Sequence, residues 1–121
     1  MFFPEGNVRV YLHARPTDMR KSFAGLYALV KHVLQEDPLS GSLYVFVNRR
    51  GNYLKLLYWD RSGFCLWAKR LERGVFVQRH SGELKRAMSY MDLKLLLEGI
   101  ELDAVRRRKR FSLERRVHER A

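Results

Sequence analysis

Four short apolar runs in the middle of the sequence constrain the fold more than any other feature. Each is rich in aromatic and branched residues, and they are Leu43–Asn48, Tyr53–Trp59, Phe64–Leu71 and Val75–Val77. Arg50-Gly51 and Ser62-Gly63 separate the first three runs, and glycine readily adopts the positive φ that a tight hairpin turn uses. This pattern predicts an antiparallel β-meander whose turns carry arginines.

The first turn also predicts a register. If Asn48 opposes Tyr53, side-chain alternation puts six apolar residues on one face of the sheet. They are Leu43, Val45, Val47, Leu54, Leu56 and Tyr58. The other face, with Asp60 opposite Gly63, then carries Tyr44, Phe46, Tyr53, Lys55, Leu57, Trp59, Phe64, Leu66 and Arg70. A sheet face that contacts water is normally polar, so we expect both faces to be covered.

Helical patterns on either side of these runs can supply the two covers. Apolar residues at helical spacing predict a long helix from about Asp18 to Leu34, with Thr17 as its N-cap. Ser89 and Asp92 resemble a capping box before a second, short helix that ends near Gly99. Val8–Leu12 is predicted as a first strand, and the polar segment 78–88 as a loop.

Together these elements predict one α+β domain over residues 1–102. It would contain a β-meander of about four to five strands, a long helix in the N-terminal half and a short C-terminal helix. Residues 103–121 hold a run of five basic residues and little apolar periodicity, which favours a mobile basic tail. A lone cysteine, Cys65, and the lack of a signal peptide or membrane-spanning run lead us to expect a cytoplasmic protein.

Positive charge is concentrated in two blocks of the sequence. The formal net charge is +11, and residues 49–86 hold ten Lys and Arg against three acids. Residues 101–121 hold eight Lys and Arg against four acids, whereas charges in the remaining segments cancel. Such clustering favours a polyanionic partner, with nucleic acid, and double-stranded DNA in particular, as the first candidate and an acidic membrane as the second. A basic but otherwise ordinary solvated surface is the alternative.

Arginines and lysines of the predicted turns and of the tail are the candidate nucleic-acid-binding residues, because a rigid sheet can present them to phosphates. They are Arg49, Arg50, Arg61, Lys69, Arg70, Arg73, Arg106, Arg107, Arg108, Lys109 and Arg110. The aromatic sheet face is a candidate protein interface or homo-oligomer surface if the short helix covers it incompletely. Its central residues are Phe46, Leu57, Trp59, Phe64 and Leu66, and filling the core is their alternative role.

The sequence shows no phosphate-binding glycine loop, no metal-ligand spacing and no nucleophile motif. Four histidines are scattered through the chain, so we expect no catalytic residue, no metal and no cofactor. Asp18 and Asp60 have helix-capping and turn roles that account for them without catalysis. The chain is therefore predicted not to be an enzyme, although its acids leave a metal-dependent nuclease possible in principle.

Three ordered motifs resemble a family of bacterial mobile-element proteins. The first spans Pro16–Leu26, the second begins at Leu43 and continues to Gly74, and the third is Leu95–Ile100. The family is the accessory protein TnpB, the second open-reading-frame product of insertion sequences of family sixty-six. It is distinct from the large RNA-guided nuclease that shares the symbol. The resemblance covers about residues 6–100, whereas the tail from Asp103 matches no motif.

The resemblance implies a protein that is encoded beside a separate, larger transposase and is needed for efficient transposition. It implies no catalytic residue. Three hypotheses follow: a DNA-binding accessory protein acting at element ends, an adaptor that grips the transposase or itself through the aromatic face, and a metal-dependent nuclease. Salt-sensitive DNA binding separates the first hypothesis from the second, and metal-dependent nicking would support the third.

Overall fold

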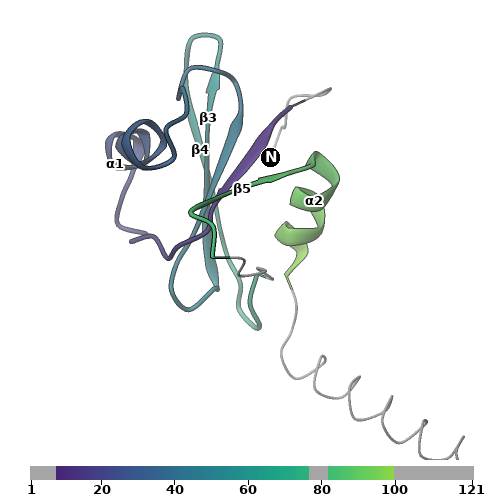
Figure 1. Cartoon of the computed structure of the whole chain (residues 1–121). Coiled ribbons are helices and arrows are strands. Elements are labelled where there is room, and N and C mark those ends of the chain that lie inside the picture. The colour runs from purple at the N-terminus through teal and green to yellow at the C-terminus, as the bar shows by residue number, and fades with distance from the viewer. Residues whose placement is uncertain (1–7, 77–81, 100–121) are drawn as a thin grey trace, which may run out of the picture.

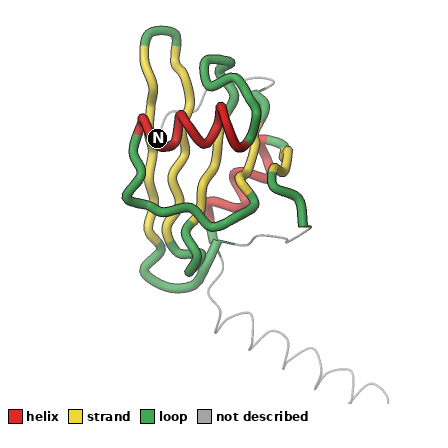
Figure 2. The backbone as a smooth tube through the Cα atoms, turned by 60° about the vertical axis from the view of Figure 1, so that its left-hand side comes forward, coloured by secondary structure: helices red, strands yellow, loops and turns green. Residues whose placement is uncertain are grey.

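The structure is a computed structural model, and it describes residues 8–76 and 82–99. Five strands form one sheet, and helical segments lie on both of its faces, giving three layers (Figures 1 and 2). In chain order the elements are β1 (Val10–His13), α1 (Phe23–Ala28), η1 (Leu29–Val33), β2 (Leu43–Val47), β3 (Tyr53–Asp60), β4 (Gly63–Arg70), β5 (Lys85–Met88) and α2 (Tyr90–Glu98).

The predicted registers of the two central hairpins are confirmed. Tyr44 pairs with Leu57 and Val45 with Leu56 between β2 and β3. Asp60 pairs with Gly63 where β3 turns into β4. Both faces of the meander therefore carry the residues expected from alternation.

The complete sheet is mixed, so an antiparallel meander describes only β2, β3 and β4. Its strand order is β4-β3-β2-β1-β5, and β1 runs parallel to β2. The described part of the fourth apolar run forms no strand: Val75 makes an isolated bridge and Phe76 packs in the core, while residue 77 lies outside the described residues. The prediction of a loop over 78–88 was wrong for its last four residues, which form β5 against β1.

The aromatic face of the sheet is covered by α1 and η1. Leu26, Val30 and Leu34 pack there against Tyr44, Phe46 and Leu57, and all six side chains are buried. The opposite face packs against Leu93, Leu96 and Leu97 of α2. The suggestion that α2 covers the aromatic face was therefore wrong, since α2 lies across the other face (Figure 1).

The first helix begins later than predicted, at Phe23, and its last part is a π-helix. Thr17 does not cap it; the Thr17 hydroxyl contacts His13 Nδ1 at 3.0 Å. Asp18 instead accepts a hydrogen bond from the backbone N–H of Arg20 at 2.9 Å. These local bonds compete with helix formation, so residues 14–22 form a connecting loop and the helix is short.

The capping box predicted at the second helix is present. Ser89 Oγ accepts from the backbone N–H of Asp92 at 3.0 Å, and Asp92 reaches back to the N–H of Ser89. Lys69 Nζ donates to the carbonyl oxygen of Leu97 at 2.7 Å, which satisfies an acceptor in the last turn of α2. Among helices of the described residues, none is long and apolar enough to cross a membrane.

Candidate nucleic-acid interface

Three loops meet at one end of the sheet, which we call the basic end. Strand direction dictates this arrangement, because β1 and β2 run toward this end, β3 runs away from it and β4 returns to it. The loops are residues 14–22, 48–52 and 71–76, at the lower end of the sheet in Figure 1. Their cations, together with Arg70 at the end of β4, are Arg15, Arg20, Lys21, Arg49, Arg50, Arg70 and Arg73.

The 48–52 loop holds Arg49 and Arg50 on a braced backbone. The side-chain oxygen of Asn48 accepts hydrogen bonds from the N–H groups of Asn52 at 3.0 Å and Tyr53 at 3.1 Å. Its side-chain nitrogen donates to Asn52 Oδ1 at 2.9 Å. The amide of Asn48 thus fixes the turn from inside, while Arg49 and Arg50 are exposed.

The 71–76 loop is bonded directly to the 48–52 loop. The N–H of Leu71 donates to the carbonyl oxygen of Asn52 at 2.8 Å, and the N–H of Phe76 donates to that of Gly51 at 2.7 Å. Gly51 has a φ of 75°, which favours glycine at this position. Arg73 is therefore held beside Arg49 and Arg50 by backbone bonds between the two loops.

The 14–22 loop is anchored to the same end of the sheet. The N–H of Thr17 donates to the carbonyl oxygen of Val47 at 2.9 Å. His13 is buried behind this loop, and burial lowers its pKa, with a further lowering from the positive charge of Arg15. A neutral His13 paired with Thr17 therefore supports the loop, whereas Arg15 itself is exposed.

One cation of this end has an acidic partner. Arg20 donates from Nη2 to Asp18 Oδ2 at 2.7 Å and from Nε to the same oxygen at 3.0 Å. These side-chain bonds from Arg20 are the main reason that the pKa of Asp18 is lowered to about 2. We therefore exclude Arg20 from the candidate site, since Asp18 already offsets its charge.

Two lysines near this end donate hydrogen bonds to backbone carbonyl oxygens and so stabilise the fold. Lys55 is buried, and its Nζ donates to the carbonyl oxygen of Lys21 at 2.7 Å. Lys69, a predicted nucleic-acid-binding residue, donates to Leu97 at the end of α2. By contrast Arg70 is exposed, and its guanidinium lies 4.6 Å from the ring centroid of Tyr53, a cation–π contact that orients it.

The predicted set of basic residues is thus divided by the structure. Arg49, Arg50, Arg70 and Arg73 lie together at the basic end, whereas Arg61 lies at the opposite end, in the β3–β4 turn. The tail residues Arg106–Arg110 lie outside the described residues, so their role stays a prediction. Within residues 8–76 and 82–99, no acidic side chain forms a salt bridge with the four clustered arginines.

Sequence reasoning missed Arg15 and Lys21 as members of this site. Arg15 lies just before the predicted helix and Lys21 in its first turn, and neither was among the predicted nucleic-acid-binding residues. The signal that could have found them is the end of the first strand at Arg15-Pro16. Because β1 is parallel to β2, the loop after β1 must lie at the same end of the sheet as the loop after β2.

The predicted interface on the aromatic face is divided in a similar way. Phe46 and Leu57 are fully buried beneath α1 and η1. Trp59, Phe64 and Leu66 are half-buried near the β3–β4 turn. The ring centroid of Phe64 lies 5.0 Å from that of Trp59 and 5.6 Å from that of Tyr27, both edge-to-face. An aromatic cluster is therefore partly accessible far from the basic end.

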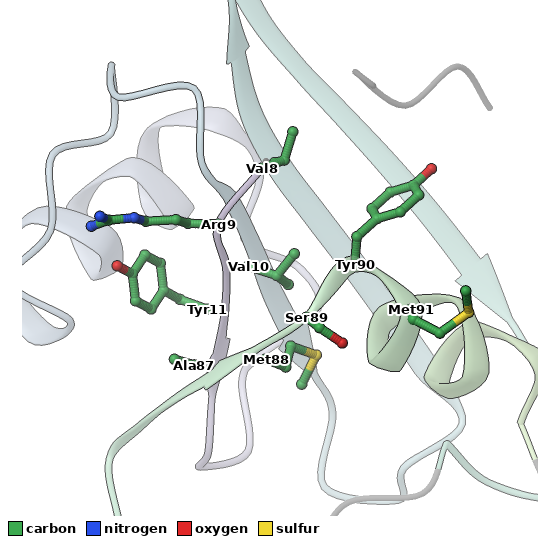
Figure 3. Close-up of a pocket in the computed structure, with 9 residues that line it drawn as sticks. All are labelled: Val8, Arg9, Val10, Tyr11, Ala87, Met88, Ser89, Tyr90 and Met91. Atoms are coloured by element: carbon green, nitrogen blue, oxygen red, sulfur yellow. The ribbon is translucent and has the colours of Figure 1, made fainter. Parts of the chain in front are cut away.

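A cavity of about 660 Å³ lies beside the first residues of β1 (Figure 3). Val8, Val10, Met88, Tyr90 and Met91 contribute apolar side chains to its lining. Arg9 also lines it, and in Figure 3 its guanidinium points away from this apolar group. Among the described residues, no three His, Cys, Asp or Glu side chains are grouped so that they could hold a metal ion.

Comparison with known proteins assigns the family. The model of the family described as IS66 Orf2 like protein matches residues 8–107. The uncharacterized protein y4hO of Sinorhizobium fredii is 43% identical over 99 residues, which cover 81% of this chain and 86% of that protein. The uncharacterized protein y4jC of the same organism is 34% identical over 108 residues, which cover 89% of this chain and 92% of that protein.

No solved structure matches the chain significantly. The family match includes all three loops of the basic end and both helices, because it extends from residue 8 to residue 107. The family match covers more than half of the chain and agrees with the three sequence motifs: the chain belongs to the IS66 Orf2-like family, which associates it with transposition of an insertion sequence.

Proposed function

We propose that this protein is a non-catalytic accessory factor in transposition that binds the DNA backbone at element ends through its basic end. Its partners would be that DNA and the separate transposase of the same element. The observation that carries the proposal is a cluster of exposed arginines on loops that are hydrogen-bonded to one another, with no salt bridge to any acid of residues 8–76 and 82–99. The family assignment supports the process, and the loop geometry supports the mode of binding.

The geometry favours phosphate contacts over base reading. Arg49 and Arg50 project from a five-residue loop, and Arg73 projects from the neighbouring loop. No helix of the described residues carries this cluster, so insertion of a recognition helix into the major groove is not the expected mode. Cations on a firm platform bind phosphates with little sequence preference and release counterions from the DNA.

Salt dependence of binding to duplex DNA tests this proposal. The intact protein should bind element-end and unrelated duplexes with similar affinity, and the affinity should fall steeply as salt rises. Replacing Arg49, Arg50 and Arg73 with Gln should reduce affinity at moderate salt by about 10-fold or more. It should also reduce the slope of log affinity against log salt by about 3, since each phosphate contact contributes about 0.9.

A control variant removes the same charge elsewhere. Lys31→Gln, Arg61→Gln and Lys94→Gln together also remove three cations, and all three side chains are exposed and none belongs to the three loops. This control should retain the wild-type slope and melting temperature. If both triple variants lose affinity equally, binding depends on net charge and the basic end is not a site.

The non-catalytic part of the proposal needs its own measurement. Supercoiled and linear element DNA is incubated with the protein and Mg²⁺ or Mn²⁺, with and without a chelator. We expect the DNA to remain intact under conditions that give full binding. Nicking that requires the metal ion and co-purifies with the protein would replace this proposal with the nuclease hypothesis.

A further inference from the structure

The two edges of the sheet are built differently. β5 has four residues, and its first two are Lys85 and Arg86, so it is a short, charged edge of the kind that resists pairing with other chains. β4 has eight residues, and Phe64–Ala68 contains no proline and no charge. None of the other four strands pairs with the outer side of β4, since it ends the strand order. Such a long apolar edge is a template for another strand.

The backbone groups available on β4 follow from its register with β3. Asp60 pairs with Gly63 across a two-residue turn, which makes this a hydrogen-bonded pair. Hydrogen-bonded and non-hydrogen-bonded pairs alternate along an antiparallel ladder. The N–H and C=O groups of Phe64, Leu66 and Ala68 therefore point away from β3, toward the open side of the edge.

Side chains of β4 provide apolar contacts on both faces of the sheet. Phe64 and Leu66 lie on the face covered by α1, and Trp67 lies on the face covered by α2. Cys65 shares the face of Trp67, and all four side chains remain half-buried. A strand added beside β4 would therefore bury apolar surface on both faces and also pair the open backbone groups.

We infer that β4 pairs antiparallel with β4 of a second copy of this chain, with the two-fold axis at Leu66. In this register Phe64 of one copy opposes Ala68 of the other, so a large side chain faces a small one. The cationic end of each strand, at Lys69 and Arg70, lies beside the turn that carries Asp60 in the other copy. That turn also carries Arg61, so it presents one opposite and one like charge, and the size match of Phe64 with Ala68 is what favours this register.

The self-complementary pattern is what selects a second copy over another partner. An antiparallel pair of identical strands closes on itself and leaves no further open edge of this kind, because β5 is charged and short. The two sheets would join into one continuous sheet with a helix layer on each face. This inference does not depend on DNA binding by the basic end.

The first test blocks the outer edge with proline. Ala68 is exposed, and its N–H points away from β3, so Ala68→Pro removes a donor from the proposed interface and none from the fold. We expect wild-type protein and the control Ala68→Ser to have the mass of a dimer by light scattering. Ala68→Pro should have the mass of a monomer with an unchanged circular-dichroism spectrum. A folded Ala68→Pro variant that stays dimeric would overturn the inference.

The second test reports the register and does not depend on proline being tolerated. In a Cys65→Ser background, Leu66→Cys puts a thiol on the two-fold axis, about 5.5 Å between Cα atoms, within disulfide range. Mild oxidation should give a covalent dimer. The control Cys65→Ser with Ala68→Cys should not, since position 68 faces Phe64 of the other copy. Equal cross-linking of both variants would contradict the register.

Wild-type protein that remains monomeric at high concentration would also overturn the inference. If the β4 amides then become protected from hydrogen exchange only when the transposase is added, the edge belongs to that partner.

Discussion

The two ends of the sheet are connected by different kinds of loop, although the same strands lead into both. At the basic end, the five-residue loop 48–52 is bonded to its neighbour and holds exposed arginines. At the opposite end, which we call the hairpin end, a two-residue turn joins β3 to β4 beside Trp59 and Phe64. At the basic end, side-chain and backbone hydrogen bonds fix the loops that carry the arginines. At the hairpin end, a short turn connects strands whose aromatic side chains pack against each other.

The largest expected difference concerns two phenylalanines on the same face. Phe46 is 0% exposed beneath α1, whereas Phe64 is half-buried at the hairpin end. Phe46→Ala should lower the free energy of unfolding by about 3–5 kcal/mol, because it leaves a cavity in the core. Phe64→Ala should cost about 1–2 kcal/mol, since water already contacts that ring. Urea titrations would measure both changes in the free energy of unfolding. Similar values for the two variants would contradict the distinction between a buried Phe46 and a half-buried Phe64.

Next in size is the removal of the amide that braces the basic end. Asn48→Ala leaves the N–H groups of Asn52 and Tyr53 without their side-chain acceptor, which should cost about 2–3 kcal/mol. The control Ser62→Ala, in the turn of the hairpin end, should change stability by less than about 0.5 kcal/mol. Asn48→Ala should also weaken DNA binding at temperatures where it remains folded. Unchanged binding would show that loop bracing does not position the arginines.

A pH effect is expected at the basic end from His13. Its pKa is lowered in the folded protein, so the unfolded chain binds more protons in the window from the usual value near 6.5 down to the folded value. Stability should therefore fall as pH decreases below about 6.5, with a slope of at most about 1.4 kcal/mol per pH unit. Urea titrations from pH 7.5 to 5 would show this slope, and His13→Gln should reduce it. An unchanged slope would assign the effect to another group.

The smallest expected effects come from the two turns. Gly51 at the basic end has a φ of 75°, and Arg61 at the hairpin end has a φ of 50°. Gly51→Ala should cost about 1 kcal/mol, because alanine is strained there. Arg61→Gly should increase the free energy of unfolding by about 0.5 kcal/mol. Glycine relieves the backbone strain at this φ, and the greater conformational freedom of the unfolded chain offsets part of that gain. Thermal unfolding of both variants measures these changes, and opposite signs are the essential result.

Arg61 also shows what turn chemistry could and could not be predicted. Glycine at position 63 was expected to supply the positive φ of the β3–β4 turn, but the positive φ lies at Arg61, two residues earlier. The pairing of Asp60 with Gly63 was still predicted correctly, because it depends on alternation and loop length. Register is thus specified by the hydrophobic pattern even where the φ angles of the turn are assigned to the wrong residue.

The parts of the fold that the sequence did not reveal are those with weak local signals. β5 reads Lys-Arg-Ala-Met, and its four residues are too few and too polar to show an apolar alternation. The parallel pairing of β1 with β2 depends on the path of residues 14–42, and no local pattern encodes it. The helix start was misplaced because Thr17 and Asp18 resemble a cap, yet make other bonds.

For the candidate site, charge clustering predicted the type of residue but not its placement. Arg49, Arg50 and Arg73 were predicted and lie together, while Arg61 is separated from them by the length of the β3–β4 hairpin. The role of Lys69 at the end of α2 required knowledge of where α2 lies. Contacts between segments that are distant in the sequence determine which basic residues lie together. The spacing of residues along the sequence does not contain this information.

The position of β1 between β2 and β5 has a consequence for the order in which this protein folds. Val10 pairs with Leu43 on one side and with Met88 on the other, although β2, β3 and β4 follow one another locally. Local hairpins close quickly, whereas pairings between distant segments require closing a long chain loop and are slow. On the ribosome, β1 is made first but acquires its last neighbour only after residue 88 has emerged. A nascent chain stalled earlier would leave one edge of β1 without β5.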